Sequence, residues 1–311
     1  MLIPVLLFIV GLLCLIKGGD WFVDGATGIA RRFHVPELLI GATVVSIGTT
    51  LPEVMVSTTS ALTGHGEIAY GNAIGSVICN SALIAAIPII VKPGKADPKS
   101  LRTPVLFFFV AAAFYAGVAY TTGYFSRPVG LVLLAMFVAY IVCNILAMKN
   151  APAPEEEEEP AENASLAKEL GLLAVGAVLI AVGADLLVDN GTLIAQALGV
   201  PESVIALTFV ALGTSLPELV TAITSLGNVI GANVFNLVLV SGVSVTLAPF
   251  AIPQNSMLFG HNASLVLEIP VMFAVMLLLT LPALIKGKLS RPQGIALLCI
   301  YAAFCVVQFT I

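Results

Sequence analysis

The sequence predicts an all-α polytopic membrane protein with ten transmembrane helices, arranged as two inverted five-helix repeats that contain discontinuous helices. Of its 311 residues, 59% are hydrophobic and only 10% are charged, whereas soluble domains carry about 25% charged residues. Many hydrophobic stretches reach the roughly 20 residues that a membrane-spanning helix needs. One phrase also occurs twice, as GTTLPE at 48–53 and as GTSLPE at 213–218, which indicates a duplicated half.

Hydropathy and helix-breaking residues place the ten spans along the chain. We expect them at 3–30, 36–63, 69–91, 102–122, 128–148, 166–198, 201–225, 227–250, 263–285 and 292–310. The Pro- and Glu-rich segment between the fifth and sixth spans cannot bury a core. We therefore expect a first repeat at 1–149, an acidic linker at 150–164 and a second repeat at 165–311. Because each half has an odd number of spans, the second half enters the membrane from the opposite side.

The loops differ strongly in basic residues. Eleven Lys and Arg residues lie on the side that the chain reaches after its first span, and only Arg127 lies on the other side. Basic loops stay in the cytoplasm, so we expect a multi-pass protein of the cell membrane with its linker in the cytoplasm and both termini outside. No basic patch with interleaved aromatic residues occurs, which argues against nucleic acid as a partner. The five cysteines lie in apolar stretches without metal-type spacing, and no cofactor is expected.

The duplicated phrase places Glu53 and Glu218 inside hydrophobic segments, 165 residues apart. A carboxylate at the bilayer centre costs about 2.5 kcal/mol or more. Two such residues at matching positions are therefore not expected by chance. The prolines before them remove a backbone donor and crowd the carbonyl four residues back, which belongs to Gly48 or Gly213. We therefore expect broken helices there, with unpaired carbonyls that line a cavity.

A second duplicated element follows, as GNAIGSVICN at 71–80 and GNVIGANVFN at 227–236. Asn72, Ser76 and Asn80 are spaced by four residues, as are Asn228, Ala232 and Asn236 in the second copy. Each trio therefore shares one helix face. Carboxylate, hydroxyl, amide and carbonyl oxygens together are the ligands of hard cations such as calcium and sodium. The alternative interpretation is that the two acids are protonated and structural, and that the asparagines join neighbouring helices.

With these motifs, nearly the whole chain resembles the calcium/cation antiporter superfamily, and more closely its prokaryotic sodium/calcium exchanger branch. The resemblance implies exchange of Na⁺ for Ca²⁺ by alternating access, with both ions as substrates and a lipid bilayer as surroundings, by a protein that functions as a monomer. It implies Glu53 and Glu218 as central ligands that also serve sodium, with further oxygens from the repeated motifs. These are expected from Thr49, Thr50, Ser76, Thr214 and Ser215, from the carbonyls of Ser46 and Ala211, and from the paired Asn80 and Asn236.

The family comparison also separates the branches. The potassium-dependent branch carries aspartate where Asn236 stands, and the proton/calcium branch replaces the hydroxyls before the acidic residue, so sodium coupling without potassium is favoured. A H⁺/Ca²⁺ exchanger remains the alternative, and a cation channel is less favoured. An intramembrane aspartyl protease is also considered, because Gly18-Gly19-Asp20 resembles its motif. However, such an enzyme has no use for duplicated hydroxyl-rich helix breaks.

Two departures from the repeat stand out. Ala232 replaces the hydroxyl that Ser76 supplies in the first half, and the repeat offset falls from 165 to 156 residues after Glu218. The missing length predicts that a short cytoplasmic loop is absent between Ser225 and Leu226. Other intramembrane acids receive weaker predictions. The pairs Asp20/Asp24 and Asp185/Asp189 are interpreted as gate residues or helix-end caps, and Glu268 as an interfacial side chain.

Overall fold

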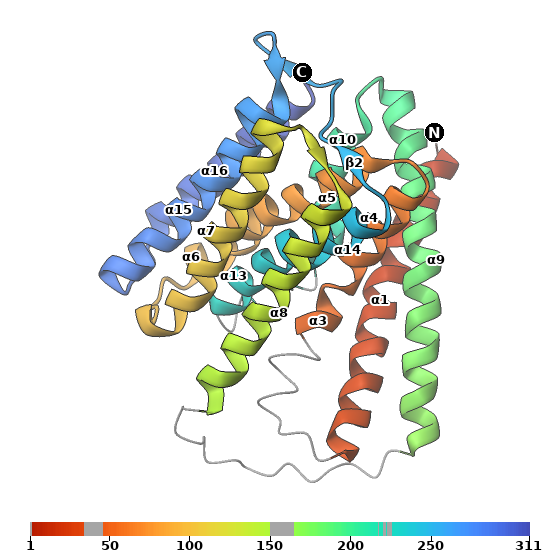
Figure 1. Ribbon diagram of the computed structural model, residues 1–311, viewed down its shortest axis with the longest axis vertical. Helices are drawn as coiled ribbons and strands as arrows, with labels where there is room; N and C mark the ends of the chain where they lie inside the picture. The colour runs from red at the N-terminus through yellow and green to blue at the C-terminus, as the bar shows by residue number, and fades with distance from the viewer. Residues whose placement is uncertain (1, 34–45, 150–164, 217, 220–221, 223–225) are drawn as a thin grey trace.

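The computed structural model describes residues 2–33, 46–149, 165–216, 218–219, 222 and 226–311. Within these residues the protein is a bundle of helices, most of them inclined along one long direction (Figure 1). The acidic linker, the boundaries of the two repeats beside it and the suspected gap after Ser225 lie outside the described residues, so those predictions stay untested.

Six elements are long uninterrupted helices. They are α1 (Leu2–Arg32), α7 (Pro98–Thr121), α8 (Arg127–Lys149), α9 (Leu166–Leu198), α15 (Ile269–Lys286) and α16 (Arg291–Gln308). The shorter α-helices are α3 (Ser46–Thr49), α4 (Leu51–Leu62), α5 (Gly66–Cys79), α6 (Ala86–Val91), α10 (Glu202–Ile205), α11 (Ala211–Thr214), α13 (Leu226–Phe235) and α14 (Ser241–Leu247).

In the described part of the chain, four π-helical turns interrupt or precede the α-helices. They are η2 (Asn80–Ile84), η3 (Ala206–Val210), η4 (Asn236–Val240) and η5 (Ser264–Glu268). Four two-residue strands form two antiparallel pairs: β1 (Tyr124–Phe125) with β2 (Phe250–Ala251), and β3 (Met257–Leu258) with β4 (His261–Asn262). The fold is therefore all-helical apart from these two short strand pairs in the loops, as the composition predicts.

Eight of the ten expected spans are helical segments long and apolar enough to cross a membrane. In the described part of the chain, the two exceptions are the second and seventh spans, at 36–63 and 201–225, which carry the duplicated proline motif. The first of these is split into α3 and α4, and the second ends its helix at Thr214. The sequence motif thus predicts correctly which two spans are discontinuous.

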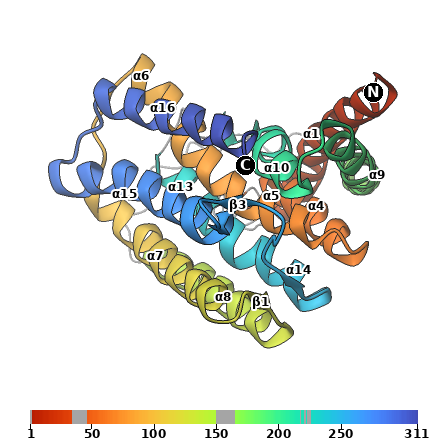
Figure 2. The same cartoon turned by 90° about the horizontal axis from the view of Figure 1, so that it is seen from above.

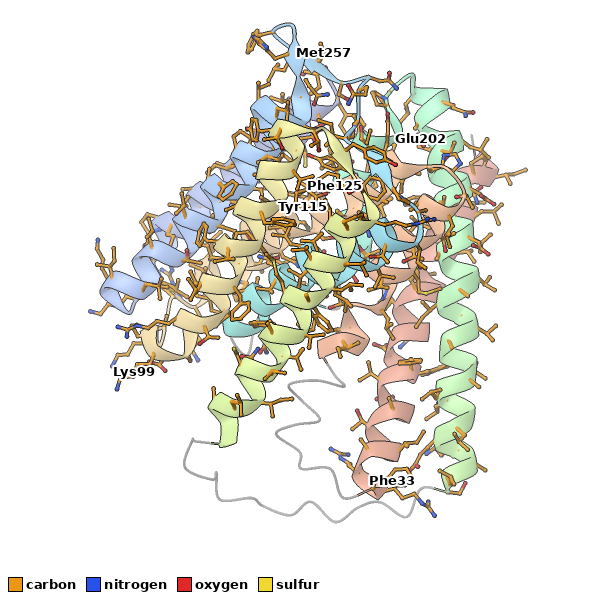
Figure 3. The ribbon with its side chains drawn as sticks, in the orientation of Figure 1. Phe33, Lys99, Tyr115, Phe125, Glu202 and Met257 are labelled. Atoms are coloured by element: carbon orange, nitrogen blue, oxygen red, sulfur yellow. The ribbon has the colours of Figure 1, made fainter. Side chains whose placement is uncertain are left out.

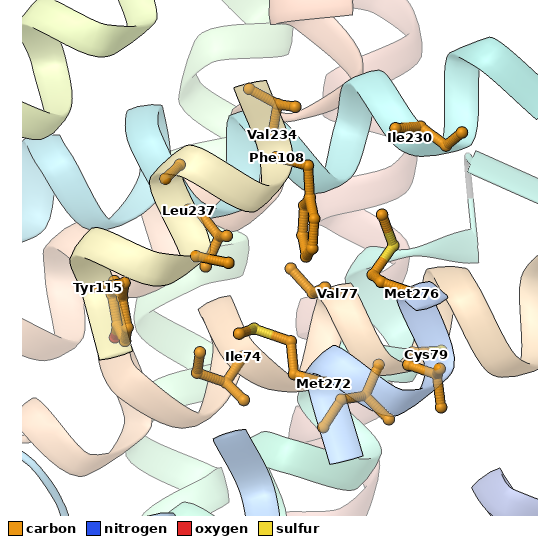
Figure 4. Close-up of a cluster of buried hydrophobic side chains, with 14 of the residues drawn as sticks. Ile74, Val77, Cys79, Phe108, Tyr115, Ile230, Val234, Leu237, Met272 and Met276 are labelled. Atoms are coloured by element: carbon orange, nitrogen blue, oxygen red, sulfur yellow. The ribbon is translucent and has the colours of Figure 1, made fainter. Parts of the chain in front are cut away.

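The two halves interlock rather than lie side by side. α5 of the first half packs against η3 and η4 of the second, α13 packs against α7, and α14 packs against α8 and α4. Figure 4 shows the apolar centre of this arrangement, where Val77 of α5 and Phe108 of α7 meet Val234 of α13 and Met276 of α15. Because these side chains are fully buried, they hold α5 and α13 in fixed positions at the middle of the bundle.

α1 and α9 form a separate antiparallel pair at the opposite edge from α15 and α16 (Figures 1 and 2). Glycines seven residues apart make their contact close. A Cβ added at Gly11 would lie 3.0 Å from the Gly183 carbonyl oxygen, and one at Gly18 would lie 2.8 Å from that of Gly176. Side chains larger than hydrogen do not fit in this seam, so the two backbones lie in direct contact.

Basic residues gather at one end of the bundle, as the loop count predicts. Arg31 and Arg32 end α1, and Lys99 lies at the same lower end in Figure 3, whereas Met257 marks the other end. Both chain termini lie at the Met257 end (Figure 1). At the basic end, Asp97 caps α7 by accepting hydrogen bonds from the amides of Lys99 and Ser100. These bonds hold the pKa of Asp97 below its ordinary value.

Candidate cation site

The first helix break lies between α3 and α4. The Thr50 amide bonds to the Ile47 carbonyl at 3.2 Å, and Pro52 occupies the first turn of α4, where its missing N–H leaves no gap in the helix. Glu53 follows in the same first turn, where the helix dipole favours a negative charge. Its side chain is fully buried, and neither carboxylate oxygen has a hydrogen-bond partner among the described residues.

The second break lies at the end of α11. Ser215 leaves the helix, and its amide bonds to the carbonyls of Ala211 and Gly213. Its side chain is fully buried, and its hydroxyl has no hydrogen-bond partner within the described part of the chain. Glu218 follows in helical conformation and is 1% exposed. Pro217, which the sequence holds responsible for this break, lies outside the described residues.

Asn72 of α5 connects the two breaks. Its Nδ2 donates to the Glu53 carbonyl at 3.2 Å and to the Ser57 hydroxyl at 2.9 Å. On the other side, the Thr214 hydroxyl donates to Asn72 Oδ1 at 3.3 Å. One buried amide therefore links α4 of the first half to α11 of the second. The asparagine that the sequence associates with helix joining does join helices, and it does so at the glutamate.

Glycines let α5 approach the second half closely enough for these bonds. A Cβ added at Gly71 would lie 2.6 Å from the Ala206 Cβ, and one at Gly75 would lie 2.7 Å from the Leu207 Cα. Any larger residue would push α5 away from η3. The glycines of the duplicated GNxxG element thus determine how near the two halves lie.

The two carboxylates share one environment. Glu53 lies close enough to Glu218 for their negative charges to repel each other. Among the ion pairs of the described residues, none involves Glu53. The described residues also hold no group of three His, Cys, Asp or Glu side chains suited to a metal. Any ion held here is therefore bound by two carboxylates together with uncharged oxygens.

Uncharged polar side chains are buried on elements that surround α4. Ser76, Asn80 and Asn236 are at most 1% exposed, and their side-chain polar atoms have no hydrogen-bond partner among the described residues. Asn80 begins the π-turn η2 and Asn236 begins η4, at matching places in the two repeats. π-turns disturb the regular pairing of backbone carbonyls and are frequent at functional sites. The matched turns present the two amides in the same local geometry.

Several polar side chains of this region are buried without a hydrogen-bond partner among the described residues. Each buried polar group left unsatisfied costs about 1–3 kcal/mol, and more if it is charged. Several such groups belong to α4, α5 and η4, which pack against one another. Carboxylate, hydroxyl and amide oxygens in a water-poor site suit a hard cation of charge one or two.

The remaining predicted ligands are placed less uniformly. Thr50 is 1% exposed, but Thr49 is partly exposed. The Ala211 carbonyl already accepts hydrogen bonds from the Ser215 amide at 3.1 Å and the Thr214 hydroxyl at 3.4 Å. Ser46 begins α3, but its side chain is outside the described part. Ala232 is partly exposed, unlike the fully buried Ser76, so the two repeats are not equivalent here.

Thr49 lines a cavity of about 290 Å³ between α1 and the first break. Asp20 and Asp24 line the same cavity, and Lys17 pairs with Asp20 at 3.2 Å. Asp20 and Asp24 are themselves exposed, and whether they act as gate residues or as helix-end caps stays a prediction. Their counterparts Asp185 and Asp189 are exposed on α9.

The sequence profile of the family described as "Sodium/calcium exchanger protein" matches this chain twice, at residues 3–146 and 168–310. This chain belongs to the sodium/calcium exchanger family. It is a multi-pass membrane cation antiporter and not an enzyme. The double match also shows that the two halves are copies of one family unit, which confirms the repeat seen in the motifs.

Relatives of this antiporter span its whole length. It is 37% identical over 303 residues to the uncharacterized membrane protein MJ0091 of Methanocaldococcus jannaschii, with 94% of each chain covered. It is 33% identical to the inner membrane protein YrbG of Escherichia coli, with 89% of each covered. The sodium/calcium exchanger MaX1 of Methanosarcina acetivorans is 28% identical, with 98% of each covered. A solved structure of the sodium-calcium exchanger NCX_Mj, soaked with Na⁺ and Sr²⁺, shares 35% identity over 97% of each chain with a TM-score of 0.64.

Two features of this antiporter were not expected from its sequence. First, α1 covers both helix breaks: a Cβ at Gly48 would lie 2.3 Å from Val23 Cγ2, and one at Gly213 would lie 2.2 Å from Leu12 Cδ2. Second, the interpretation of Glu268 as an interfacial side chain is wrong, because Glu268 is fully buried. Hydropathy gives the depth of a residue along a span, but it does not tell which neighbours surround it.

Proposed function

We propose that this antiporter exchanges Na⁺ for Ca²⁺ across the cell membrane. The observation that carries the proposal is the pair Glu53 and Glu218, buried together at two helix breaks from opposite repeats. Two negative charges balance one calcium ion, or they are shared among sodium ions. The names of the relatives MaX1 and NCX_Mj, both sodium/calcium exchangers, support the same pair of substrates.

Competition for one site supplies the coupling. With no cation bound, two carboxylates would remain charged and close together in a site that excludes water, which is unfavourable. Calcium or sodium neutralises them, so the loaded protein changes conformation more readily than the empty one. An exchanger needs this property, because it must not return empty.

Alternating access follows from the position of α1. α1 packs over both helix breaks through Val23 and Leu12, and it rests on α9 through the glycine seam. We propose that α1 and α9 slide together against the rigid bundle and uncover one break at a time. Crosslinking rates between cysteines placed on α1 and α4 would test this motion. Equal rates in sodium and in calcium would contradict it.

Several finer properties belong to the same proposal. The end with Arg31, Arg32 and Lys99 is the cytoplasmic end, both termini face outside, and one chain suffices for transport. Asn236, an uncharged amide, gives no additional negative charge for a potassium ion, so transport does not require potassium. A cysteine-labelling experiment with a membrane-impermeant reagent at either end of α1 checks the orientation.

Calcium flux into liposomes tests the exchange itself. Liposomes loaded with Na⁺ should take up ⁴⁵Ca²⁺, and liposomes loaded with choline should not. Glu53→Gln keeps the shape of the side chain but removes one charge, and we expect it to lower uptake at least 100-fold. Glu67→Gln is the matched control, because Glu67 lies in the first turn of α5 and bonds to Asn255 instead.

Three results would contradict the proposal, and the first two indicate another function. Uptake driven by a pH gradient without sodium would indicate H⁺/Ca²⁺ exchange. Uptake that needs no counter-ion and does not saturate would indicate a channel. Unchanged uptake by Glu53→Gln would mean that this carboxylate does not bind the transported ion.

A further inference from the structure

A second buried carboxylate lies outside the candidate cation site. Glu268 ends the π-turn η5, which follows the β3–β4 pair whose Met257 stands at the top of Figure 3. It is fully buried and forms no ion pair within the described residues. The transport cycle described above makes no use of it.

Three uncharged side chains surround this carboxylate. Ser264 lies almost one turn earlier in η5, Tyr70 comes from α5 and Gln308 from the end of α16. All three are fully buried. The cluster of Glu268, Ser264, Tyr70 and Gln308 is therefore built from three different parts of the fold, and none of its members belongs to the Glu53/Glu218 site.

The cluster is poor in hydrogen bonds. Gln308 Nε2 donates to Glu268 Oε1 at 3.3 Å. However, Glu268 Oε2, Ser264 Oγ, Tyr70 OH and Gln308 Oε1 have no hydrogen-bond partner among the described residues. Buried polar atoms are almost always paired in folded proteins. Three neighbouring side chains thus bring oxygens that lack a partner among the described residues near a carboxylate whose own Oε2 also lacks one, and oxygens grouped in this way can serve as ligands of an ion.

The backbone of η5 is irregular and is anchored beside the cluster. In η5 the Ile269 amide bonds to the Ser264 carbonyl, five residues back. Such a turn leaves a neighbouring carbonyl without its usual partner. The Tyr120 hydroxyl also bonds to the Leu265 carbonyl of this turn, which anchors η5 to α7.

We propose that this cluster is a second cation site that holds one Na⁺. All of its donors are oxygens, the ligands that hard cations prefer. Its single carboxylate balances one positive charge, whereas a divalent ion would leave an excess charge in an apolar interior. Because α5, η5 and α16 each supply a ligand, the ion joins these elements at the outer end of the protein and stabilises the fold.

The proposal does not rest on Na⁺/Ca²⁺ exchange at the first site, and the experiment separates the two. The double variant Glu53→Gln/Glu218→Gln removes both carboxylates of the first site. In this background, thermal unfolding is measured in calcium-free buffer while NaCl replaces choline chloride at constant ionic strength. We expect Na⁺ to raise the Tm by about 5 °C when its concentration is roughly 100 times the Kd.

Added substitutions identify the ligands. Glu268→Gln should abolish the Na⁺-dependent rise in Tm, and Ser264→Ala should raise the Na⁺ concentration required about tenfold. Glu67→Gln is the control: it removes a carboxylate whose charge acts on Glu268 from outside the cluster, and it should leave the Na⁺ effect in place. If the double variant does not fold, equilibrium binding of ²²Na⁺ to the parent and to Glu268→Gln replaces it, and the number of bound ions should fall by one.

Either of two outcomes overturns the proposal. A Na⁺-dependent rise that survives Glu268→Gln would assign the ion elsewhere. A Tm that is insensitive to Na⁺ but depends on pH only when Glu268 is present would mean that the carboxyl carries a proton instead of binding a metal ion.

Discussion

Gly18→Ala is the sharpest test of the seam between α1 and α9. The added Cβ would lie 2.8 Å from the Gly176 carbonyl oxygen and 2.9 Å from both the Ile180 amide nitrogen and the Leu179 Cβ. Two of these atoms belong to the backbone, so α9 itself must move. Inserting a methyl group into a packed contact costs about 1–3 kcal/mol, while replacing glycine in a helix returns about 0.5–1 kcal/mol. We expect a net loss of up to about 2.5 kcal/mol in the free energy of unfolding.

Gly171→Ala is the matched control on the same pair of helices, because nothing lies within 4 Å of a Cβ at Gly171. It should be neutral or slightly stabilising. With roughly 2–4 °C per kcal/mol, thermal unfolding of the purified protein resolves the two variants. Sodium-driven ⁴⁵Ca²⁺ uptake by Gly18→Ala should also fall several-fold below that of Gly171→Ala if the seam moves during transport. If Gly18→Ala matches Gly171→Ala in both stability and uptake, close backbone contact between α1 and α9 is not required, and the sliding motion loses its basis.

Two further predictions concern single polar groups. Ser76→Ala removes a buried hydroxyl that has no hydrogen-bond partner among the described residues. The ion-free protein should therefore keep its Tm within about 1 °C, while the calcium concentration for half-maximal uptake rises about tenfold. A large loss of Tm without calcium would instead mean that this hydroxyl is structural. Asp97→Ala removes the cap of α7, whose carboxylate has a lowered pKa. A carboxyl group whose pKa is lowered in the folded protein stabilises the fold at pH values above its unfolded-state pKa, and this stabilisation is lost as the pH falls through its folded-state pKa. The variant should therefore have a lower Tm than the parent at pH 7, and the difference in Tm should disappear in acid. A gap that is independent of pH would show that the carboxylate charge plays no part in capping.

The duplicated motifs were sufficient to predict the fold, while the ligand set that they indicate for the site stays a prediction. Glu53 and Glu218 are recognisable because a charge inside an apolar segment is costly, and a costly residue that occurs at matching positions in two copies has a shared role. The helix break before Glu53 follows from covalent geometry, since proline lacks a donor wherever it stands. The choice between Na⁺ and H⁺ as the coupling ion does not follow in this way, because both ions neutralise the same carboxylates.

Other features were beyond the reach of sequence patterns. Thr49 and Thr50 are adjacent and chemically identical, yet one lines a cavity beside α1 and the other is buried at the break. The π-turns at Asn80 and Asn236 depend on small deviations of the backbone that no residue type enforces. In the same way, Ala232 matches Ser76 in the repeat but differs from it in burial, because the neighbours of the two repeats are not the same.

The sequence alone determined how deep each residue lies, which oxygens are available and how the two halves are oriented, because these depend on hydropathy, residue type and an odd number of spans. Only the tertiary structure decided the direction in which each side chain faces around its helix and what it meets there. The burial of Glu268 among Ser264, Tyr70 and Gln308 and the cover that α1 places over both breaks were decided in this way. The physical reason is that packing against helices distant in sequence sets the rotation of each helix about its axis. In a span that is apolar on nearly all sides, the sequence does not show which face packs inward.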